Sequence, residues 1–474
     1  MRKRIWIVLL VLLLLAAGLG GWLLWQRHEQ NTHVFVENAV YDRDARFLDL
    51  RGQEISVSHY EALRQELPLC DIVWDVPFQG GTWPSDAETI AVTSLTMADV
   101  ETLDYLTALK TVDAAQCRDY EALAALEARR PELTVAYSIR LGDTDYPRDV
   151  SDLSFSQADG AELLERLQYL PNLKSVRFDE DVLPAADLAA LQGAYPHIDF
   201  SWEKTVLGTA YPSTVTELDF SGTPLTSVDE LEAAVPYFPH LQKLVLCDTG
   251  LDNETLAAFR DRVRDRCKVV WKVNLGRMDI RTDETTFMPR KQGVNMQDPE
   301  MDNLKYCEDM LVVDVGHMGH VKDLQWLYGM PHLQFLVLVE TGVTDLTPIG
   351  SLKDLIYLEL FKSPGITDYA PLVGCTALED VNVAYTHGDA AVFAQMPWLK
   401  NLWVNQTGIS PETRALLTEK LPDTHIEFDA GWHMGNGWRD VENYYLMRDL
   451  LEMPYYNWGS TKHVIGSRET VPQE

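Results

Sequence analysis

The sequence predicts an α/β solenoid, in which parallel strands form one side of a stack of coils and short helices and turns form the other. The first observation is the near-constant interval between strand-like segments in residues 333–428. The first apolar residues of five segments lie 22, 23, 21 and 24 residues apart: Leu336, Leu358, Val381, Leu402 and Ile426. A βαβ crossover needs about 30 residues or more, so a doubly wound sheet does not fit this spacing.

The second observation is the alternation of side chains within each segment. Leu336 and Leu338 lie on one face of a strand, as do Leu358 and Leu360, so both pairs are expected to face the core. Coils of 20–29 residues with this alternation are typical of leucine-rich repeats. Looser pairs of the same kind occur upstream: Leu48/Leu50, Ile72/Trp74, Ile90/Val92, Val135/Tyr137, Leu153/Phe155, Val176/Phe178, Ile198/Phe200, Leu218/Phe220, Leu244/Leu246 and Val269/Trp271.

A longer unit of about three coils is superimposed on this pattern. The dipeptide Leu-Gly recurs at 141–142, 207–208 and 275–276, at intervals of 66 and 68 residues. Tyr-Pro follows the first two, at 146–147 and 211–212. We expect one continuous stack of coils, interrupted only near 277–303, where the strand spacing doubles and polar residues and proline accumulate.

Composition excludes two broad classes of protein. The 474 residues include 72 Asp and Glu but 40 Lys and Arg, which gives a formal net charge of −32. Because binding to nucleic acid phosphates needs clustered cations, a nucleic acid partner is not expected. With 46% hydrophobic residues the chain can bury a sizeable core, which excludes wholesale disorder.

The N-terminus predicts a membrane anchor. Three basic residues at positions 2–4 precede an uncharged, mostly apolar stretch from Ile5 to Trp25. As a helix its 21 residues would span about 32 Å, which matches a bilayer's hydrocarbon core. The basic residues predict a cytoplasmic N-terminus and an extracytoplasmic location for the rest of the chain at the plasma membrane. A cleaved signal peptide is the alternative, because Ala16, Ala17 and Gly18 are small enough for a peptidase.

These patterns divide the chain into seven parts. They are a cytoplasmic end (1–4), a transmembrane helix (5–25), a linker and N-terminal cap (26–46), a first repeat array (47–276), an insertion or seam (277–303), a second repeat array (304–429) and an aromatic-rich C-terminal cap (430–474). The cap is expected because the end of a solenoid exposes a strand edge and core residues that must be covered. A sugar-binding platform formed by Trp432, Tyr455, Tyr456 and Trp458 is the alternative for that last segment.

The stretch TGVTDLTPIGSLKDLIYLELFKSPGITDYAPLVGCTALEDVNV resembles the internalin-type leucine-rich repeats of bacterial surface proteins. The resemblance is specific for 333–428 and looser for 47–276. It implies a curved solenoid that binds proteins, commonly on another surface. One feature departs from the family, whose turn usually contains Asn. Here the turn contains a hydroxyl: Thr223, Thr249, Thr341, Ser363, Thr386 and Thr407.

Reactive residue types do not form a recognisable catalytic motif. The segment DVGHMGH brings Asp314, His317 and His320 together in sequence as candidate metal ligands, but it lacks the Glu of H-E-x-x-H and follows a strand rather than lying on a helix. The six cysteines lack a C-x-x-C pair, and Cys70, Cys267 and Cys375 occupy apolar positions just before strands. We interpret them as core residues, with a disulfide as the alternative. We therefore expect no enzyme activity, no metal and no cofactor.

Binding is the function that this pattern favours, and the concave face is where we expect it. The concave face consists of the strand residues that alternate with the core leucines. In the C-terminal coils it combines aromatic, amide and acidic side chains, a composition typical of binding hot spots. The candidates are Phe335, Tyr357, Glu359, Phe361, Asp380, Asn382, Asn401, Trp403 and Asn405.

The partner expected from these residues is a protein or peptide, and acidic strand residues favour a basic one. The concave face of the middle coils contains Asp152, Asp179, Asp199, Glu217 and Asp219, and a basic partner would complement it. Two alternatives remain: an envelope scaffold without a diffusible ligand, and a metal-dependent hydrolase on the solenoid.

Overall fold

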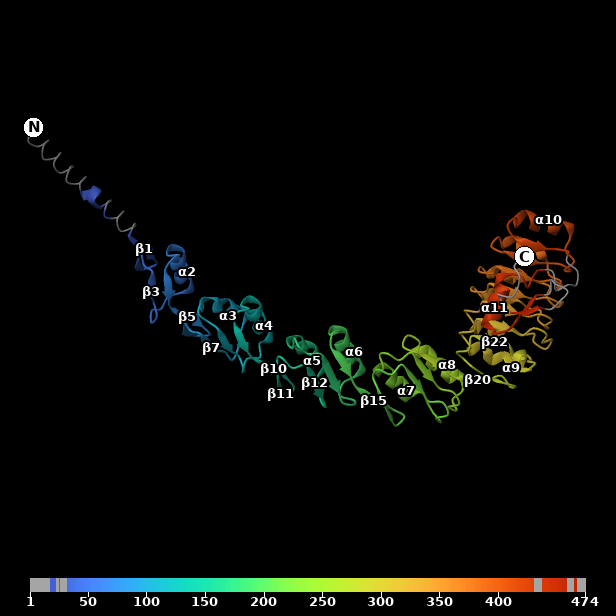
Figure 1. Ribbon diagram of the computed structural model, residues 1–474, viewed down its shortest axis with the longest axis horizontal. Coiled ribbons are helices and arrows are strands. Elements are labelled where there is room, and N and C mark those ends of the chain that lie inside the picture. The colour runs from blue at the N-terminus through green and yellow to red at the C-terminus, as the bar shows by residue number, and fades with distance from the viewer. Residues whose placement is uncertain (1–17, 23–24, 26–31, 430–436, 458–463, 467–474) are drawn as a thin grey trace, which may run out of the picture. The chain divides into compact units, whose positions relative to one another are not determined.

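The computed structural model describes residues 18–22, 25, 32–429, 437–457 and 464–466, with side chains undescribed at 455–457 and 464–466 (Figure 1). It divides the chain into two compact units, Met1–Glu203 and Lys204–Glu474. Among the described residues no helix is long and apolar enough to cross a membrane. Most of the expected anchor, residues 5–17 and 23–24, lies outside the described residues.

The first unit consists of parallel strands in short separate sheets, each preceded by an antiparallel hairpin. The hairpins are β1 (His33–Val36) with β2 (Ala39–Asp42), β5 (Asp75–Phe78) with β6 (Gly81–Pro84), and β10 (Ser138–Leu141) with β11 (Thr144–Pro147). The parallel sheets are β3 (Phe47–Asp49) with β4 (Asp71–Val73), β7 (Thr89–Ala91) with β8 (Thr111–Asp113) and β9 (Thr134–Ala136), and β12 (Asp152–Phe155) with β13 (Ser175–Phe178) and β14 (Asp199–Ser201).

The coils of this unit close through helices on the side away from the strands. They are α2 (Val57–Glu66), α3 (Met97–Thr102), α4 (Tyr120–Arg129), α5 (Gly160–Arg166) and α6 (Ala185–Ala194). Side-chain caps fix several starts: Ser56 accepts from the backbone N–H of His59, and Asp159 accepts from Ala161 and Glu162. Each helix turns apolar side chains inward, such as Leu123 and Leu126 of α4, which are fully buried, and Val100 of α3.

The second unit begins with the same arrangement. Hairpin β15 (Glu203–Val206) and β16 (Thr209–Pro212) precedes a parallel sheet of β17 (Glu217–Asp219), β18 (Lys243–Val245) and β19 (Lys268–Val270), with helices α7 (Asp229–Ala234) and α8 (Asn253–Val263). Hairpin β20 (Lys272–Asn274) and β21 (Asp279–Arg281) follows. The expected seam at 277–303 therefore contains the return strand of this hairpin, strand β22 (Thr286–Phe287) and helix α9 (Asp298–Met301).

A seven-stranded parallel sheet then runs without interruption from β22 to β28. Its members are β22, β23 (Val312–Asp314), β24 (Phe335–Val337), β25 (Tyr357–Glu359), β26 (Asp380–Asn382), β27 (Asn401–Trp403) and β28 (His425–Glu427). Five residues pair one after another across neighbouring strands in a single register, which confirms the predicted alignment of coils: Leu336, Leu358, Val381, Leu402 and Ile426. The connections between these strands contain short 3₁₀ helices, together with the α-helices α9 and α10 (Pro411–Lys420).

The structure differs from the expected continuous stack in the first array. Each longer unit of about 66 residues is a short parallel sheet preceded by a ten-residue hairpin, and the hydrogen-bond ladder between coils stops at each hairpin. The Leu-Gly markers lie at the hairpin turns. Leu207 and Gly208 both have positive φ, at +50° and +81°, as a two-residue type I′ turn requires.

The predicted core is confirmed. Leu336, Leu338, Leu358 and Leu360 are buried, and the apolar pairs of the earlier coils are buried with few exceptions. All six cysteines are free and buried, as the core interpretation requires, and burial raises the pKa of the Cys375 thiol to about 12.

Hydroxyl side chains at the turns after the strands bond to backbone carbonyls. Thr341 donates to the carbonyl of Leu338, three residues back, over 2.9 Å, and Thr407 does the same to Val404 over 2.7 Å. Ser363 also links neighbouring coils, because its Oγ donates to the Leu338 carbonyl and accepts from the backbone N–H of Thr341. These bonds satisfy the carbonyls of Leu338 and Val404.

Candidate ligand-binding face

The concave face of the C-terminal sheet is covered rather than open. Phe335, Tyr357 and Trp403 retain 1%, 2% and 2% of their exposure, so the expectation that these aromatic side chains are exposed is wrong. Of the nine candidates, only Phe361 and Asn401 are partly exposed. The others are buried: Phe335, Tyr357, Glu359, Asp380, Asn382, Trp403 and Asn405.

The cover is a helix from the C-terminal segment, α11 (Glu442–Leu450), which lies on the array near β22 to β25 (Figure 1). Tyr444, Met447 and Leu451 occur three and four residues apart, so they share one face of the helix. They form one buried cluster with side chains of three strands, which we call the α11 contact surface: Val312, Phe335, Val337, Val339 and Tyr357. Burial of this apolar area holds α11 on the face.

Polar contacts fix the register of α11 along the strands. Asn443, which is buried, donates through Nδ2 to Oε2 of Glu379 at 3.0 Å and to Oδ2 of Asp380 at 2.9 Å. The other carboxylate oxygen of Asp380 accepts from Asn401 Nδ2 at 2.7 Å. Asn443 therefore satisfies a carboxylate that would otherwise be buried with a single side-chain donor.

Further contacts are made at the two ends of α11. Before the helix, Trp438 stacks on Phe361 with ring centroids 5.8 Å apart and planes 20° from parallel. After it, Lys291 donates to the carbonyl of Leu451 at 3.0 Å, and buried Arg448 donates to the carbonyl of Pro454 at 3.1 and 2.7 Å. The helix is thus held along its length and at both ends.

The interface between α11 and the strands encloses charge. Burial raises the pKa of Glu359 to about 7, while the charges of Arg439 and Arg448 and a hydrogen bond from the Tyr357 hydroxyl oppose the rise. Asp314 adds negative charge nearby, and burial raises its pKa as well. Glu359 is therefore a carboxylate that titrates near neutral pH in a closed interface.

The described helix of the C-terminal segment lies on the concave face, whereas the sequence predicts 430–474 as a cap at the end of the solenoid. Residues 430–436, 458–463 and 467–474 lie outside the described residues. The physical reason is the match between an amphipathic helix and an apolar strand face. Trp432 and Trp458 lie outside the described residues, and the side chains of Tyr455 and Tyr456 are undescribed.

The concave strand faces of the other sheets are different in character. Asp152 and Asp199 are exposed on the sheet of β12–β14, and Asp179 is exposed directly after β13. Glu217 and Asp219 are exposed on β17 of the second unit. These acidic side chains match the sequence expectation for an open face. The apolar concave side chains of β23 to β25 are the ones that α11 covers.

The candidate metal ligands do not converge. Asp314 accepts from the backbone N–H of Gly316 at 3.0 Å, whereas His317 lies in a left-handed turn and pairs with Glu340 at 2.8 Å. His320 is exposed. Across the described parts of the chain, no three His, Cys, Asp or Glu residues are arranged to hold a metal ion.

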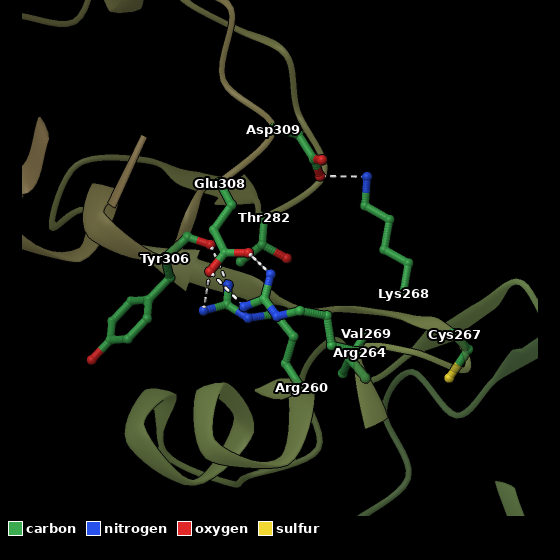
Figure 2. Close-up of a pocket in the computed structure, with 9 residues that line it drawn as sticks. All are labelled: Arg260, Arg264, Cys267, Lys268, Val269, Thr282, Tyr306, Glu308 and Asp309. Carbon is green, nitrogen blue, oxygen red and sulfur yellow. Dashed lines mark hydrogen bonds and ion pairs between the residues drawn. The ribbon is translucent and has the colours of Figure 1, made fainter. Parts of the chain in front are cut away.

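A cavity of about 170 Å³ lies where the coil of α8 and β19 meets the coil that follows the seam (Figure 2). Arg260 and Arg264 converge on Glu308, at 2.6 and 2.8 Å, and Lys268 pairs with Asp309. Since each of these cations has a carboxylate partner within the protein, the cavity lacks a free charge to attract an ionic ligand. The network instead joins successive coils across the seam.

Among known proteins, several leucine-rich-repeat proteins of solved structure are similar to this chain at low sequence identity. No family model matches the chain, and no curated protein matches it. Among solved structures, internalin C2 of Listeria monocytogenes is 17% identical, covers 48% of this chain and 88% of its own, and has a TM-score of 0.27. The chain has a leucine-rich-repeat-like fold. Internalin F of the same organism is 14% identical, covers 74% of this chain and 91% of its own, and has a TM-score of 0.25. A leucine-rich-repeat protein of Leptospira interrogans is 12% identical, covers 81% of this chain and 90% of its own, and has a TM-score of 0.27.

The raised pKa of Glu359 predicts a pH dependence of stability. The pKa is about 7 in the folded state against an ordinary 4.5, so the folded chain holds this proton more tightly. Stability is then lost as pH rises from about 4.5 to 7, by on the order of 3 kcal/mol at most. Glu359→Gln should reduce the loss of stability between pH 5 and 8, measured as the urea midpoint at each pH.

Glu340→Gln is the matched control. Glu340 lies in the neighbouring coil, and its pKa is lowered by the hydrogen bond from His317 and by Lys362, so its contribution has the opposite sign. In that variant the urea midpoint should still fall between pH 5 and pH 8. An unchanged pH profile in Glu359→Gln would show that the carboxylate does not titrate in this window.

Proposed function

We propose that this protein is a membrane-anchored, extracytoplasmic leucine-rich-repeat protein that binds a protein or peptide through the concave face of its C-terminal sheet. The observation behind the proposal is the complementarity between that face and α11. The face presents an apolar surface, a pair of carboxylates that bind an amide and a stacking site for an aromatic ring. Together these features form a surface built to bind a helix.

The chain's own helix occupies this surface, so a ligand must compete with α11. A competing segment would need the same chemistry: apolar side chains three and four residues apart, an amide or other donor for Asp380, and cationic side chains near Glu359. Because α11 belongs to the same chain, its effective concentration at the face is high, and ligand binding is correspondingly weakened. Binding would then be coupled to release of α11.

The overall charge supports a protein ligand rather than a nucleic acid. The acidic strand residues of the uncovered faces are exposed: Asp152, Asp179, Asp199, Glu217 and Asp219. A basic partner would be attracted to them before it reached the C-terminal face, at a rate that falls with salt. This function requires no catalytic group and no cofactor.

A scaffold without a diffusible ligand is the second candidate. The observation that favours it is the completeness of the α11 contacts, because a helix buried along its length and held at both ends acts as a permanent structural element. The two candidates differ in whether α11 can be exchanged.

A peptide in solution tests whether the face binds an exchangeable helix. The probe is a labelled peptide with the sequence of residues 437–454, and the protein is the full chain with Tyr444→Asp and Met447→Asp, which weaken the hold of its own α11. We expect fluorescence anisotropy to show binding to this variant and binding at least ~100-fold weaker to the unaltered chain.

Two controls make the result specific. A chain with Leu446→Asp and Leu450→Asp changes only side chains that are 39% exposed on α11, so it should behave like the unaltered chain. A peptide with Asn443→Ala and Met447→Asp should not bind. Absence of binding of the unaltered peptide to the Tyr444→Asp, Met447→Asp chain would favour the scaffold.

The anchor rests on residues 5–25, whose length and flanking charge match a membrane-spanning helix. Deletion of residues 5–25 should move the protein from the membrane pellet to the soluble fraction after alkaline extraction. The intact mass of the membrane-bound protein should include Met1. A mature chain that begins after the small residues at 16–18 would instead establish the cleaved signal peptide.

A further inference from the structure

The hairpin β1–β2 exposes apolar side chains on its outer face. Phe35 and Val40 are directly opposite each other in the register and keep 56% and 55% of their exposure. Side chains at opposite positions of an antiparallel pair are in contact on one face of the ribbon. The pair therefore forms a continuous apolar patch at the surface.

The exposure is not a consequence of a loose hairpin. The opposite face is packed, because Val34, Val36 and Tyr41 are buried. The hydroxyl of Tyr41 bonds to Nε2 of His59 at 2.9 Å, and the other ring nitrogen of His59 pairs with Glu37 in the hairpin turn at 3.0 Å. The hairpin is fixed on α2 through its inner face, which leaves the outer pair turned toward solvent.

The later hairpins show that an apolar pair is not needed at this position. The equivalent pair is Arg140 with Asp145 in β10–β11, joined by a salt bridge at 3.4 Å. In β20–β21 the equivalent pair is Asn274 with Asp279, joined by a hydrogen bond at 2.6 Å. In β5–β6 it is Pro77 with Thr82. The first hairpin thus differs from these three in exposing two sizeable apolar side chains.

The same difference occurs on the strand that follows. Phe47 begins β3 and is 57% exposed, whereas the residues that begin the equivalent strands of later sheets are polar. They are Thr89 in β7, Asp152 in β12 and Glu217 in β17. Exposed apolar side chains therefore occur on β1, β2 and β3, at positions where the later strands compared above have polar residues or proline.

The position of the hairpin in the chain indicates what covers the patch. His33, where β1 begins, follows Trp25 by eight residues, which can extend over at most roughly 29 Å. If residues 5–25 span a membrane, the hairpin must stay within that distance of the bilayer surface. Apolar side chains on the hairpin can reach the interfacial region, where their transfer from water is favourable.

We propose that hairpin β1–β2 inserts Phe35 and Val40 into the interface of the lipid bilayer in which residues 5–25 are anchored, and so orients the repeat array relative to the membrane. This inference rests on the proposed anchor. A zwitterionic surface fits best, because the formal charge of −32 would be repelled by anionic headgroups.

The test uses the full chain reconstituted in phosphatidylcholine vesicles. An environment-sensitive fluorophore is attached to Asn38→Cys, an exposed turn position beside the patch, and in a second sample to Asp143→Cys, the equivalent turn position of β10–β11. The native cysteines are buried, so labelling is directed to the introduced thiol. We expect a blue-shifted emission and quenching by headgroup-labelled lipid at position 38, and neither at position 143.

A charge variant separates contact from proximity. Phe35→Arg with Val40→Asp copies the Arg140–Asp145 pair on the outer face and leaves the buried face intact. It should abolish the shift and the quenching at position 38 while the chain still floats with the vesicles. Signals that persist in this variant, or a blue shift without lipid quenching (which indicates a second copy or another protein over the patch), would overturn the inference.

Flotation of the chain with the vesicles tests the anchor separately from the docking of the hairpin. A chain that floats but shows no signal at position 38 retains the anchor and refutes the docking of the hairpin. A chain that does not float refutes the anchor, and the docking with it.

Discussion

The burial of an apolar strand face under α11 is the interaction on which the rest of the C-terminal unit depends. The concave positions of β23 to β25 contain Val312, Phe335, Val337 and Tyr357, which would be exposed on an empty solenoid. Each large apolar side chain that is removed from water contributes roughly 1.5–3 kcal/mol. Tyr444, Met447 and Leu451 provide the complementary surface, and Asn443 satisfies the carboxylate of Asp380. The face and the helix are therefore two parts of one core.

This constraint explains why the concave faces differ along the chain. On β12–β14 the concave positions include the exposed acidic side chains Asp152 and Asp199. Under α11 the equivalent positions of β23 to β25 include buried apolar and aromatic side chains, and Asp380 of the next strand is hydrogen-bonded to Asn443. Competition between α11 and a ligand for this face connects the structure with the proposed function.

Sequence periodicity predicted the coils well because the period arises from local physics. The core leucines must return once per coil, and a strand requires alternation, so Leu336, Leu358 and Leu402 could be aligned from the sequence. The sequence did not predict the antiparallel hairpins. The Leu-Gly dipeptides at 207–208 and 275–276 indicate a longer repeat, but not its structure. An isolated ten-residue hairpin has too little pattern of its own to be distinguished from an irregular coil.

The sequence locates the candidate face, but it does not predict whether that face is exposed or covered. Periodicity correctly assigned Phe335, Tyr357 and Trp403 to the strand face opposite the core, yet whether they are exposed depends on contacts with a segment that lies far away in the chain. The sequence contains one signal: the helical spacing of Tyr444, Met447 and Leu451 is that of an amphipathic helix, which needs an apolar face to cover it. Long-range docking of this kind has no local signature, so it requires the structure.

The central claim is that α11 is bound to the concave face, and amide hydrogen exchange along Glu442–Leu450 in the full chain tests it most directly. The account predicts that these amides are protected, and that Asn443→Asp, which places a third carboxylate beside Glu379 and Asp380, removes the protection while the amides of β12–β14 are unaffected. Rapid exchange of the α11 amides in the unaltered chain, at the rate of a free helix, would contradict it.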